Sequence, residues 1–195
     1  RDGRLYGEIR CSKSIVGGER NSIECNGPCN VISGNGTHGV LASETTTNTV
    51  QGNYIGTNPE GTKPIPNSSY GVALGNGASH NIIGAAQDAP ISGLCVGLCN
   101  LIRSNRKGGV AVTGATSSGN TIRGNQLYDN GGLAIDLGNN EHTYNDTGDI
   151  DGGPNDWMNF PRRLTAQSDG ATTTIKGSLD TLNPEAVQVD IYVSD

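Results

Sequence analysis

Apolar residues recur at fixed places in a short phrase that returns five times between Asn30 and Asn125. Each copy begins with Asn and carries Ile or Val at its third position, and four copies end with a second Asn. The copies are residues 30–35, 48–53, 81–86, 100–105 and 120–125. Other segments have apolar residues at alternate positions, namely Gly39–Ala42, Gly71–Leu74, Gly109–Val112 and Leu133–Leu137. Alternation is the period of a β-strand, so the pattern predicts short strands along the whole repeat.

Each repeat unit is too short to bury its own apolar face, so neighbouring units must stack and share a core. Stacking at the inter-strand spacing of about 4.8 Å predicts two inward rows of aliphatic side chains. We expect one row to contain Ile32, Val50, Ile83, Ile102 and Ile122, and the other to contain Val40, Val72, Val110 and Leu133. The sequence thus predicts an all-β coil of stacked rungs.

The Asn that ends each phrase suits a corner of such a coil. Asn tolerates the left-handed backbone region, and its amide can bond to the equivalent Asn one rung away. We therefore predict an Asn ladder formed by Asn35, Asn53, Asn105 and Asn125, with an interruption at Ala86.

Three phrases carry a resemblance to a known family: Asn30-Val-Ile-Ser-Gly-Asn35, Gly52-Asn-Tyr-Ile-Gly-Thr-Asn-Pro-Glu-Gly-Thr62 and Ala134-Ile-Asp-Leu-Gly-Asn139. From about Ser14 to Leu164, the chain resembles the right-handed parallel β-helix repeat proteins of the pectate-lyase-like superfamily. The likeness is to the branch found in large secreted bacterial surface proteins. It implies a right-handed parallel β-helix (solenoid) over residues 1–160, with residues 138–160 as an acidic C-terminal cap loop. It does not specify an activity, because the superfamily mixes lyases, hydrolases, epimerases and tailspikes with non-catalytic adhesion or structural modules.

From Pro161 onward the sequence has a new pattern, typical of antiparallel β-structure. Thr172–Leu179 and Val187–Val193 alternate strictly, which predicts antiparallel strands with one face buried. A sandwich domain often follows the β-helix in the resembled proteins. Residues 161–195 are therefore expected to be the start of a β-sandwich-like domain whose remainder is absent.

Composition narrows the class of partner. The 195 residues include 30 glycines and are 33% hydrophobic, which suits a thin coil lined by Val and Ile. The formal net charge is −6 and the basic residues form no extended patch, so nucleic acid is not expected as a partner. No apolar run approaches the roughly 18 residues of a membrane span.

Four of the five cysteines stand in two matching phrases, Cys25-Asn-Gly-Pro-Cys29 and Cys95-Val-Gly-Leu-Cys99. With about three rungs between the phrases, equivalent cysteines would lie on the order of 14 Å apart, beyond disulfide reach. Local bridges within each phrase are predicted instead, which implies an oxidising compartment. Zinc is the alternative, although the Cys-x3-Cys spacing and the lack of an adjacent His disfavour it. Cys11 has no evident partner.

The acidic, Gly-rich segment Asn139–Asp156 has two interpretations. Asp146, Asp149, Asp151 and Asn145 offer oxygen ligands for calcium, although the spacing departs from that of an EF-hand at Gly153. The alternative is a solvated acidic cap over the open end of the coil. We expect the residues that follow, Trp157, Met158 and Phe160, to plug the apolar end.

Two further groups of residues are candidates for ligand binding. The long insertion between Asn53 and Tyr70 carries Tyr54, Lys63 and Tyr70 for sugar stacking and hydrogen bonding, or is a decorated corner held by three prolines.

Arg103 is expected to lie above Arg123 on one face. A lyase-like interpretation makes one of these two arginines the proton-abstracting base and Asp136 a calcium ligand. The alternative is that the two arginines only keep the face solvated.

The sequence favours a non-catalytic extracellular or cell-surface β-helix module that acts as a structural spacer, an adhesin or a subunit of an extracellular assembly. Its expected partners are polysaccharide or like protein subunits. The main alternative is a calcium-assisted polysaccharide lyase or epimerase, and the other is a glycan-binding module that uses the insertion after Asn53.

Overall fold

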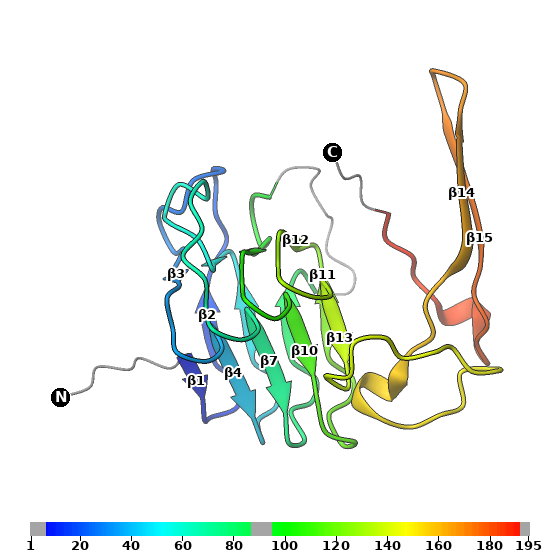
Figure 1. The fold of residues 1–195 in the computed structure, drawn as a ribbon, viewed down its shortest axis with the longest axis horizontal. Helices are drawn as coiled ribbons and strands as arrows, with labels where there is room; N and C mark the ends of the chain where they lie inside the picture. Colours follow the sequence, from blue (N-terminus) through cyan, green and yellow to red (C-terminus); the bar gives the residue numbers. More distant parts are fainter. Residues whose placement is uncertain (1–6, 87–94, 192–195) are drawn as a thin grey trace.

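The computed structural model describes residues 7–86 and 95–191. The chain is all-β: thirteen of its short strands form three parallel sheets, and two more strands form an antiparallel hairpin (Figure 1). The α-helix is absent from the described ranges, where two 3-10 turns, η1 (Pro154–Trp157) and η2 (Pro184–Ala186), are the helical elements.

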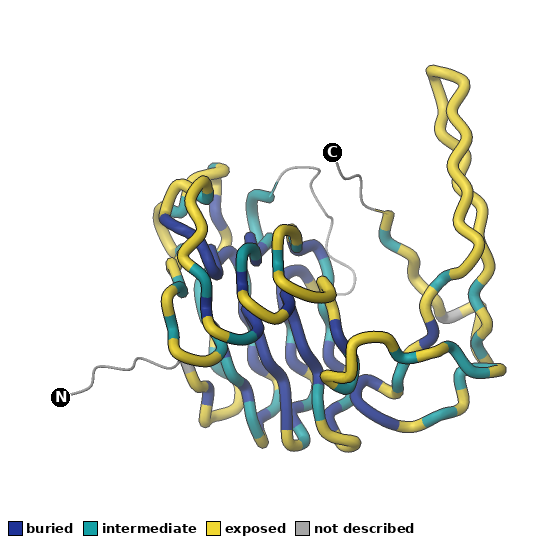
Figure 2. The backbone as a smooth tube through the Cα atoms, in the orientation of Figure 1, coloured by how far each residue is buried: buried dark blue, intermediate teal, exposed yellow. Residues whose placement is uncertain are grey.

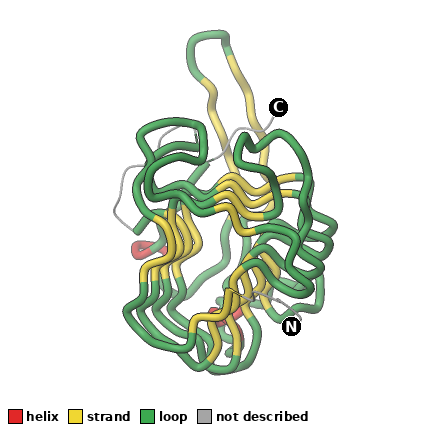
Figure 3. Tube along the Cα trace, turned by 90° about the vertical axis from the view of Figure 1, so that its left-hand side faces the viewer, coloured by secondary structure: helices red, strands yellow, loops and turns green. Residues whose placement is uncertain are grey.

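The chain passes through the three sheets in turn and repeats the circuit. The first sheet contains β1 (Gly7–Ile9), β4 (Val40–Ser43), β7 (Val72–Gly75), β10 (Val110–Val112) and β13 (Ile135–Leu137). The second contains β2 (Ile15–Gly17), β5 (Thr49–Gln51), β8 (Ile82–Gly84) and β11 (Thr121–Arg123). The third contains β3 (Val31–Ile32), β6 (Tyr54–Ile55), β9 (Leu101–Arg103) and β12 (Gln126–Tyr128). Viewed along the stack, the sheets form three separate walls, an arrangement compatible with a parallel β-helix (Figure 3).

The repeated phrase builds two walls, not one. Val16, Val50, Ile83 and Ile122 are in register on the second sheet, whereas Ile32, Ile55, Ile102 and Leu127 are in register on the third. The prediction of a single row was therefore wrong, although its members do face the core. Strands of the second sheet and of the third sheet both occur in the same Asn-x-Ile/Val phrase. The phrase therefore does not reveal to which of the two sheets a strand belongs.

The row on the first sheet follows the prediction except at its last member. Val40, Val72 and Val110 are in register and no more than 1% exposed. The next residue in this row is Ile135, while Leu133 is 43% exposed. A shift of two residues keeps the same face of a strand, so alternation alone could not exclude it.

Asparagine side chains form three ladders that run from rung to rung. Their Nδ2–Oδ1 hydrogen bonds are 2.8–3.1 Å long. The ladders are Asn30–Asn53–Asn100–Asn125, Asn35–Asn67–Asn105–Asn130 and Asn48–Asn81–Asn120–Asn155. The predicted bond between equivalent asparagines is confirmed, but the four predicted members belong to two ladders. Asn100, not Ala86, follows Asn53.

Asn100 illustrates how completely each amide is used. Its Oδ1 accepts hydrogen bonds from the main-chain N–H (2.9 Å) and the Nδ2 (3.1 Å) of Asn53. Its own Nδ2 donates to the carbonyl of Val50 and to Asn125 Oδ1, both at 2.8 Å. An amide has two donors and an oxygen with two lone pairs, so this side chain is fully satisfied although it is 0% exposed.

The C-terminal segment leaves the stack. β14 (Arg162–Ser168) pairs antiparallel with β15 (Thr173–Ser178), and every residue of both strands is exposed (Figure 2). The antiparallel strand predicted over Thr172–Leu179 is present, but its partner precedes it, and the predicted burial of one face is wrong because neither face of this hairpin is covered. The other predicted strand is wrong over its described part, since residues 187–191 are not in a strand, and its last two residues lie outside the described ranges.

The predicted apolar plug is also wrong for two of its three residues. Met158 is 62% exposed and Phe160 is 40% exposed. Asn155 is the residue of this segment that enters the stack, where its Oδ1 accepts from the main-chain N–H of Asn120 at 2.9 Å. A polar corner residue, not an apolar side chain, therefore continues the coil here.

We predict that Asn100→Asp destabilises the protein by about 3 kcal/mol or more, because two buried donors are lost and a charge is buried among acceptors. Asn26→Asp, in an exposed loop, should change stability by no more than about 0.5 kcal/mol. Denaturant unfolding of both variants checks this prediction. A loss below about 1 kcal/mol for Asn100→Asp would mean that the ladder contributes little.

Candidate functional site

Three carboxylates converge in the segment that follows β13. Asp146, Asp149 and Asp151 each offer an oxygen, and these three oxygens lie within 4.8 Å of one another. Each residue is half-buried. No other group of at least three His, Cys, Asp or Glu side chains close enough to share a metal ion occurs in residues 7–86 and 95–191.

Local hydrogen bonds bend the chain so that these oxygens meet. Asp146 Oδ2 accepts from the main-chain N–H of Ile150 at 3.2 Å, and Asp149 Oδ1 accepts from that of Asn159 at 2.7 Å. The Asn159 side chain also accepts from the N–H of Asp146 at 3.0 Å and donates to its carbonyl at 2.9 Å. Asn159 is 4% exposed and organises the loop. Sequence reasoning missed it, because an Asn eight residues after the last member of the acidic cluster gives no local signal.

The cluster has unused acceptors. The Oδ1 atoms of Asp146 and Asp151 are buried and have no hydrogen-bond partner. Burial, followed by the charges of Asp146 and Asp149, raises the pKa of Asp151 above its ordinary value. A bound cation would offset both the repulsion and the desolvation. Hard carboxylate and carbonyl oxygens are the ligands that Ca²⁺ prefers, so the donor set fits calcium better than zinc.

Asn145, the fourth predicted ligand, is engaged elsewhere. Its Nδ2 donates to the carbonyl of Phe160 at 2.7 Å, and its Oδ1 accepts from the N–H of Phe160 at 3.2 Å. Asn145 therefore anchors the beginning of the loop to its end.

The predicted sugar-stacking residues are buried. Tyr54 is 3% exposed and donates its hydroxyl hydrogen bond to the carbonyl of Ile23, and Tyr70 is 7% exposed. Lys63 is exposed, but the loop that carries it folds back, with Asn58 Oδ1 accepting from the N–H groups of Thr62 and Lys63 at 2.8 Å each. A sugar cannot stack on rings that solvent does not reach, so the stacking prediction was wrong for Tyr54 and Tyr70.

The two arginines lie on different sheets, so the predicted column was also wrong. Arg103, on β9, donates to Asp129 and to the carbonyl of Gly61, both at 2.9 Å, and its guanidinium lies over the Tyr128 ring. Arg123, on β11, donates to both carboxylate oxygens of Asp190 at 2.6 and 3.0 Å. Each guanidinium is held by an ion pair.

Asp136 is buried at the end of the first sheet and is 3% exposed. It accepts from the Tyr70 hydroxyl at 2.8 Å and from the N–H of Asn140 at 3.3 Å. Burial, together with the bond to Asp136, raises the pKa of Tyr70 well above its ordinary value, so the phenol stays protonated. Asp136 is not a member of the described carboxylate cluster.

Both predicted disulfides are present. Cys25–Cys29 and Cys95–Cys99 have Cα–Cα distances of 5.2 and 5.1 Å, and Cys11 is free and exposed. Sulfurs bonded to each other do not bind zinc, and the two bridges are compatible with an extracellular location.

Comparisons with protein-family models, curated proteins and solved structures gave no match to this chain. Within the described ranges, no helix has the length and apolar character needed to cross a bilayer.

We expect Ca²⁺ to bind at Asp146, Asp149 and Asp151. At about 100 times its Kd, Ca²⁺ should stabilise the fold by about 2.7 kcal/mol. Asp151→Asn should weaken binding about tenfold or more by removing a charged ligand. Asp169→Asn, at the exposed hairpin turn, is the matched control and should bind like the unmodified protein. Calorimetric titration checks both variants, and no heat or thermal shift at millimolar Ca²⁺ would favour the solvated cap.

Proposed function

We propose that this chain is a right-handed parallel β-helix module of a secreted or cell-surface protein, and that it serves as a rigid, non-catalytic spacer or as a subunit of an extracellular assembly. The observation that supports this proposal best is the set of three Asn ladders beside the three sheets. They commit the polar corner residues of the chain to bonds between rungs.

Such a construction resists bending, which suits a spacer. Neighbouring rungs are joined by main-chain hydrogen bonds in the three sheets. At three corners they are also joined by a hydrogen bond between asparagine side-chain amides. The aliphatic rows then exclude water from the interior, with Ile55, Ile83 and Ile102 each 0% exposed. In solenoid proteins each repeat contacts only the repeats next to it, so repeats can be added to lengthen the protein without changing the contacts between them.

The residues required by the lyase alternative are used structurally. A guanidinium base must reach the substrate and lose a proton, whereas Arg103 and Arg123 pair with Asp129 and Asp190. Asp136 likewise accepts the Tyr70 hydroxyl. These contacts favour the structural role over polysaccharide lyase or epimerase chemistry.

Calcium is the second part of the proposal, favoured by the two unpartnered carboxylate oxygens. Asp146, Asp149 and Asp151 lie between the last strand of the stack and the hairpin (Figure 1). A bound ion would hold this segment in one conformation and so fix the direction in which the next element leaves the coil. That role fits an extended surface protein, in which the angle between successive modules determines how far the protein extends from the cell.

Incubation with a panel of acidic polysaccharides in the presence of Ca²⁺ tests the non-catalytic assignment. We predict no release of unsaturated uronides beyond that of Arg123→Ala, because neither arginine is available as a base. Activity that Arg123→Ala abolishes while its circular dichroism and unfolding transition are retained would overturn the proposal. Binding of a polysaccharide without turnover would instead identify the module as an adhesin.

A further inference from the structure

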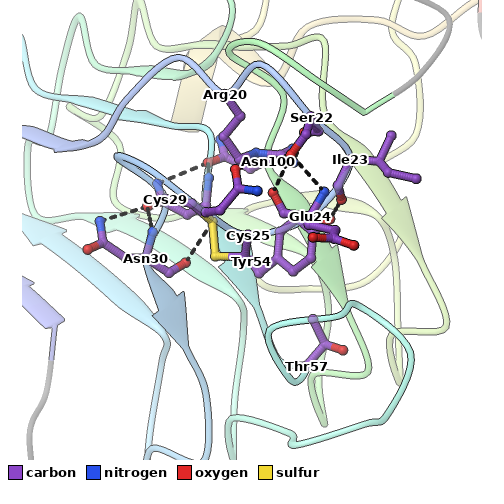
Figure 4. The surroundings of a disulfide bond; sticks show 12 residues. Arg20, Ser22, Ile23, Glu24, Cys25, Cys29, Asn30, Tyr54, Thr57 and Asn100 are labelled. Carbon is purple, nitrogen blue, oxygen red and sulfur yellow. Dashed lines mark hydrogen bonds between the residues drawn. A yellow bond between two sulfur atoms is a disulfide. The ribbon is translucent and has the colours of Figure 1, made fainter.

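Arg20 is a buried cation held by carbonyl groups. It is 2% exposed and lies between β2 and β3. Its Nη1 donates to the carbonyl of Ser22 at 3.0 Å, and its Nη2 donates to those of Cys95 at 2.7 Å and Cys99 at 3.0 Å. The guanidinium carbon lies 4.9 Å from the centre of the Tyr54 ring. Figure 4 shows Arg20, Ser22 and Tyr54 around the first disulfide.

These contacts join two loops that are distant in sequence. We call residues 20–29 the first clip loop and residues 95–99 the second clip loop. Arg20 and Gly97 exchange main-chain hydrogen bonds of 2.9 and 2.8 Å, and the N–H of Gly52 donates to the carbonyl of Leu98 at 3.0 Å. The second clip loop therefore lies against Arg20. In the first clip loop, the carbonyl of Ile23 accepts a hydrogen bond from the Tyr54 hydroxyl.

The second clip loop supplies two of the three carbonyls that accept from Arg20. Burial lowers the pKa of Arg20, the Tyr54 side chain opposes this shift, and Arg20 Nε is buried without a hydrogen-bond partner. Three carbonyls accept from the other two guanidinium nitrogens. A buried charge that loses its acceptors costs several kcal/mol. The carbonyls of Cys95 and Cys99 reach one nitrogen together because a disulfide closes the loop between them, with the two Cα atoms 5.1 Å apart.

We propose that Arg20 and the Cys95–Cys99 disulfide form a redox-sensitive latch, in which opening this disulfide releases Arg20 and with it the first clip loop. A dithiol reductant would transfer two electrons to the bridge. The S–S bond breaks, each sulfur ends as a thiol, and the dithiol becomes a disulfide. The second clip loop then no longer holds two carbonyls toward one point, and the guanidinium moves to solvent.

The two disulfides are not equivalent in this latch. The acceptors of Arg20 are at Ser22, Cys95 and Cys99. The ring closed by Cys25 and Cys29 contains none of them, since Ser22 precedes it. Opening the second bridge should therefore release Arg20, whereas opening the first should not. This asymmetry separates a latch from a general loss of stability.

Limited trypsin digestion of the whole chain, followed by mass spectrometry, tests the latch at the Arg20–Asn21 bond. We expect Cys95→Ser with Cys99→Ser to speed cleavage of this bond by about tenfold or more, since the Arg20 hydrogen bonds are lost. Cys25→Ser with Cys29→Ser is the matched control and should cleave at the unmodified rate. Arg20→Lys, which keeps the tryptic site but cannot fork between carbonyls, should cleave faster with both bridges intact.

Cleavage after Arg103 and Arg123, which lie in strands of the stack, reports global unfolding. If these sites open together with Arg20–Asn21 in the Cys95/Cys99 variant, the device is not local and the proposal fails. It also fails if both disulfide variants cleave at Arg20 equally, or if neither differs from the unmodified chain.

Discussion

The hydrogen bond between asparagine side chains of successive rungs is the interaction on which this architecture depends. A coil of short strands must turn three corners per circuit, and buried corners leave main-chain groups that need partners. The Oδ1 of a ladder Asn accepts from the Asn of the preceding rung. Its Nδ2 donates to a main-chain carbonyl of that preceding rung and to the Asn Oδ1 of the next rung, as in Asn53, Asn67 and Asn81. The amide thereby fixes the position of each corner relative to its neighbours, and the aliphatic rows follow.

This solution explains how a chain with 33% hydrophobic residues forms a well-excluded interior. The core is a narrow column of aliphatic side chains, and all twelve buried members of its main cluster are Ile, Val, Leu or Ala. Polar residues also line the corners without remaining unsatisfied, since Asn48, Asn53, Asn67 and Asn100 are no more than 1% exposed. Buried asparagine would be costly in most cores, but here each amide meets another amide.

Periodicity predicted the parallel stack, and the bond between equivalent asparagines followed from its corners. The assignment of residues to walls failed because two corners use one phrase. Asn67 and Asn155 were missed because insertions or long excursions separate them from any Asn-x-Ile phrase, and Asn130 was missed because its phrase begins at Asn125 and carries Leu127 in place of Ile or Val. The three acidic ligands could be predicted from their spacing, whereas the burial of Tyr54 and Tyr70 depends on how loops fold back over the outer face. Pairings such as Tyr70 with Asp136, 66 residues apart, leave no local trace.

In the proposed function, the regular stack and the irregular segments have different roles. The stack supplies a stiff frame, while the clip loops and the acidic segment gather the groups that can respond to their surroundings, namely two disulfides and a carboxylate cluster. Binding and regulation commonly reside on such loops over a rigid scaffold. The structure thus favours a module whose length and direction are fixed by the coil and whose response to solution conditions resides at its edges.

Residue-resolved hydrogen exchange of the asparagine side-chain amides by NMR tests the ladders most directly. The Nδ2 hydrogens of Asn53, Asn67, Asn81, Asn100 and Asn105 should exchange as slowly as main-chain amides in the central strands, and those of the exposed Asn26 should exchange at the rate of a free peptide. Ladder amides that exchange as fast as Asn26 would contradict the account, since buried and mutually bonded amides cannot do so while the stack is closed.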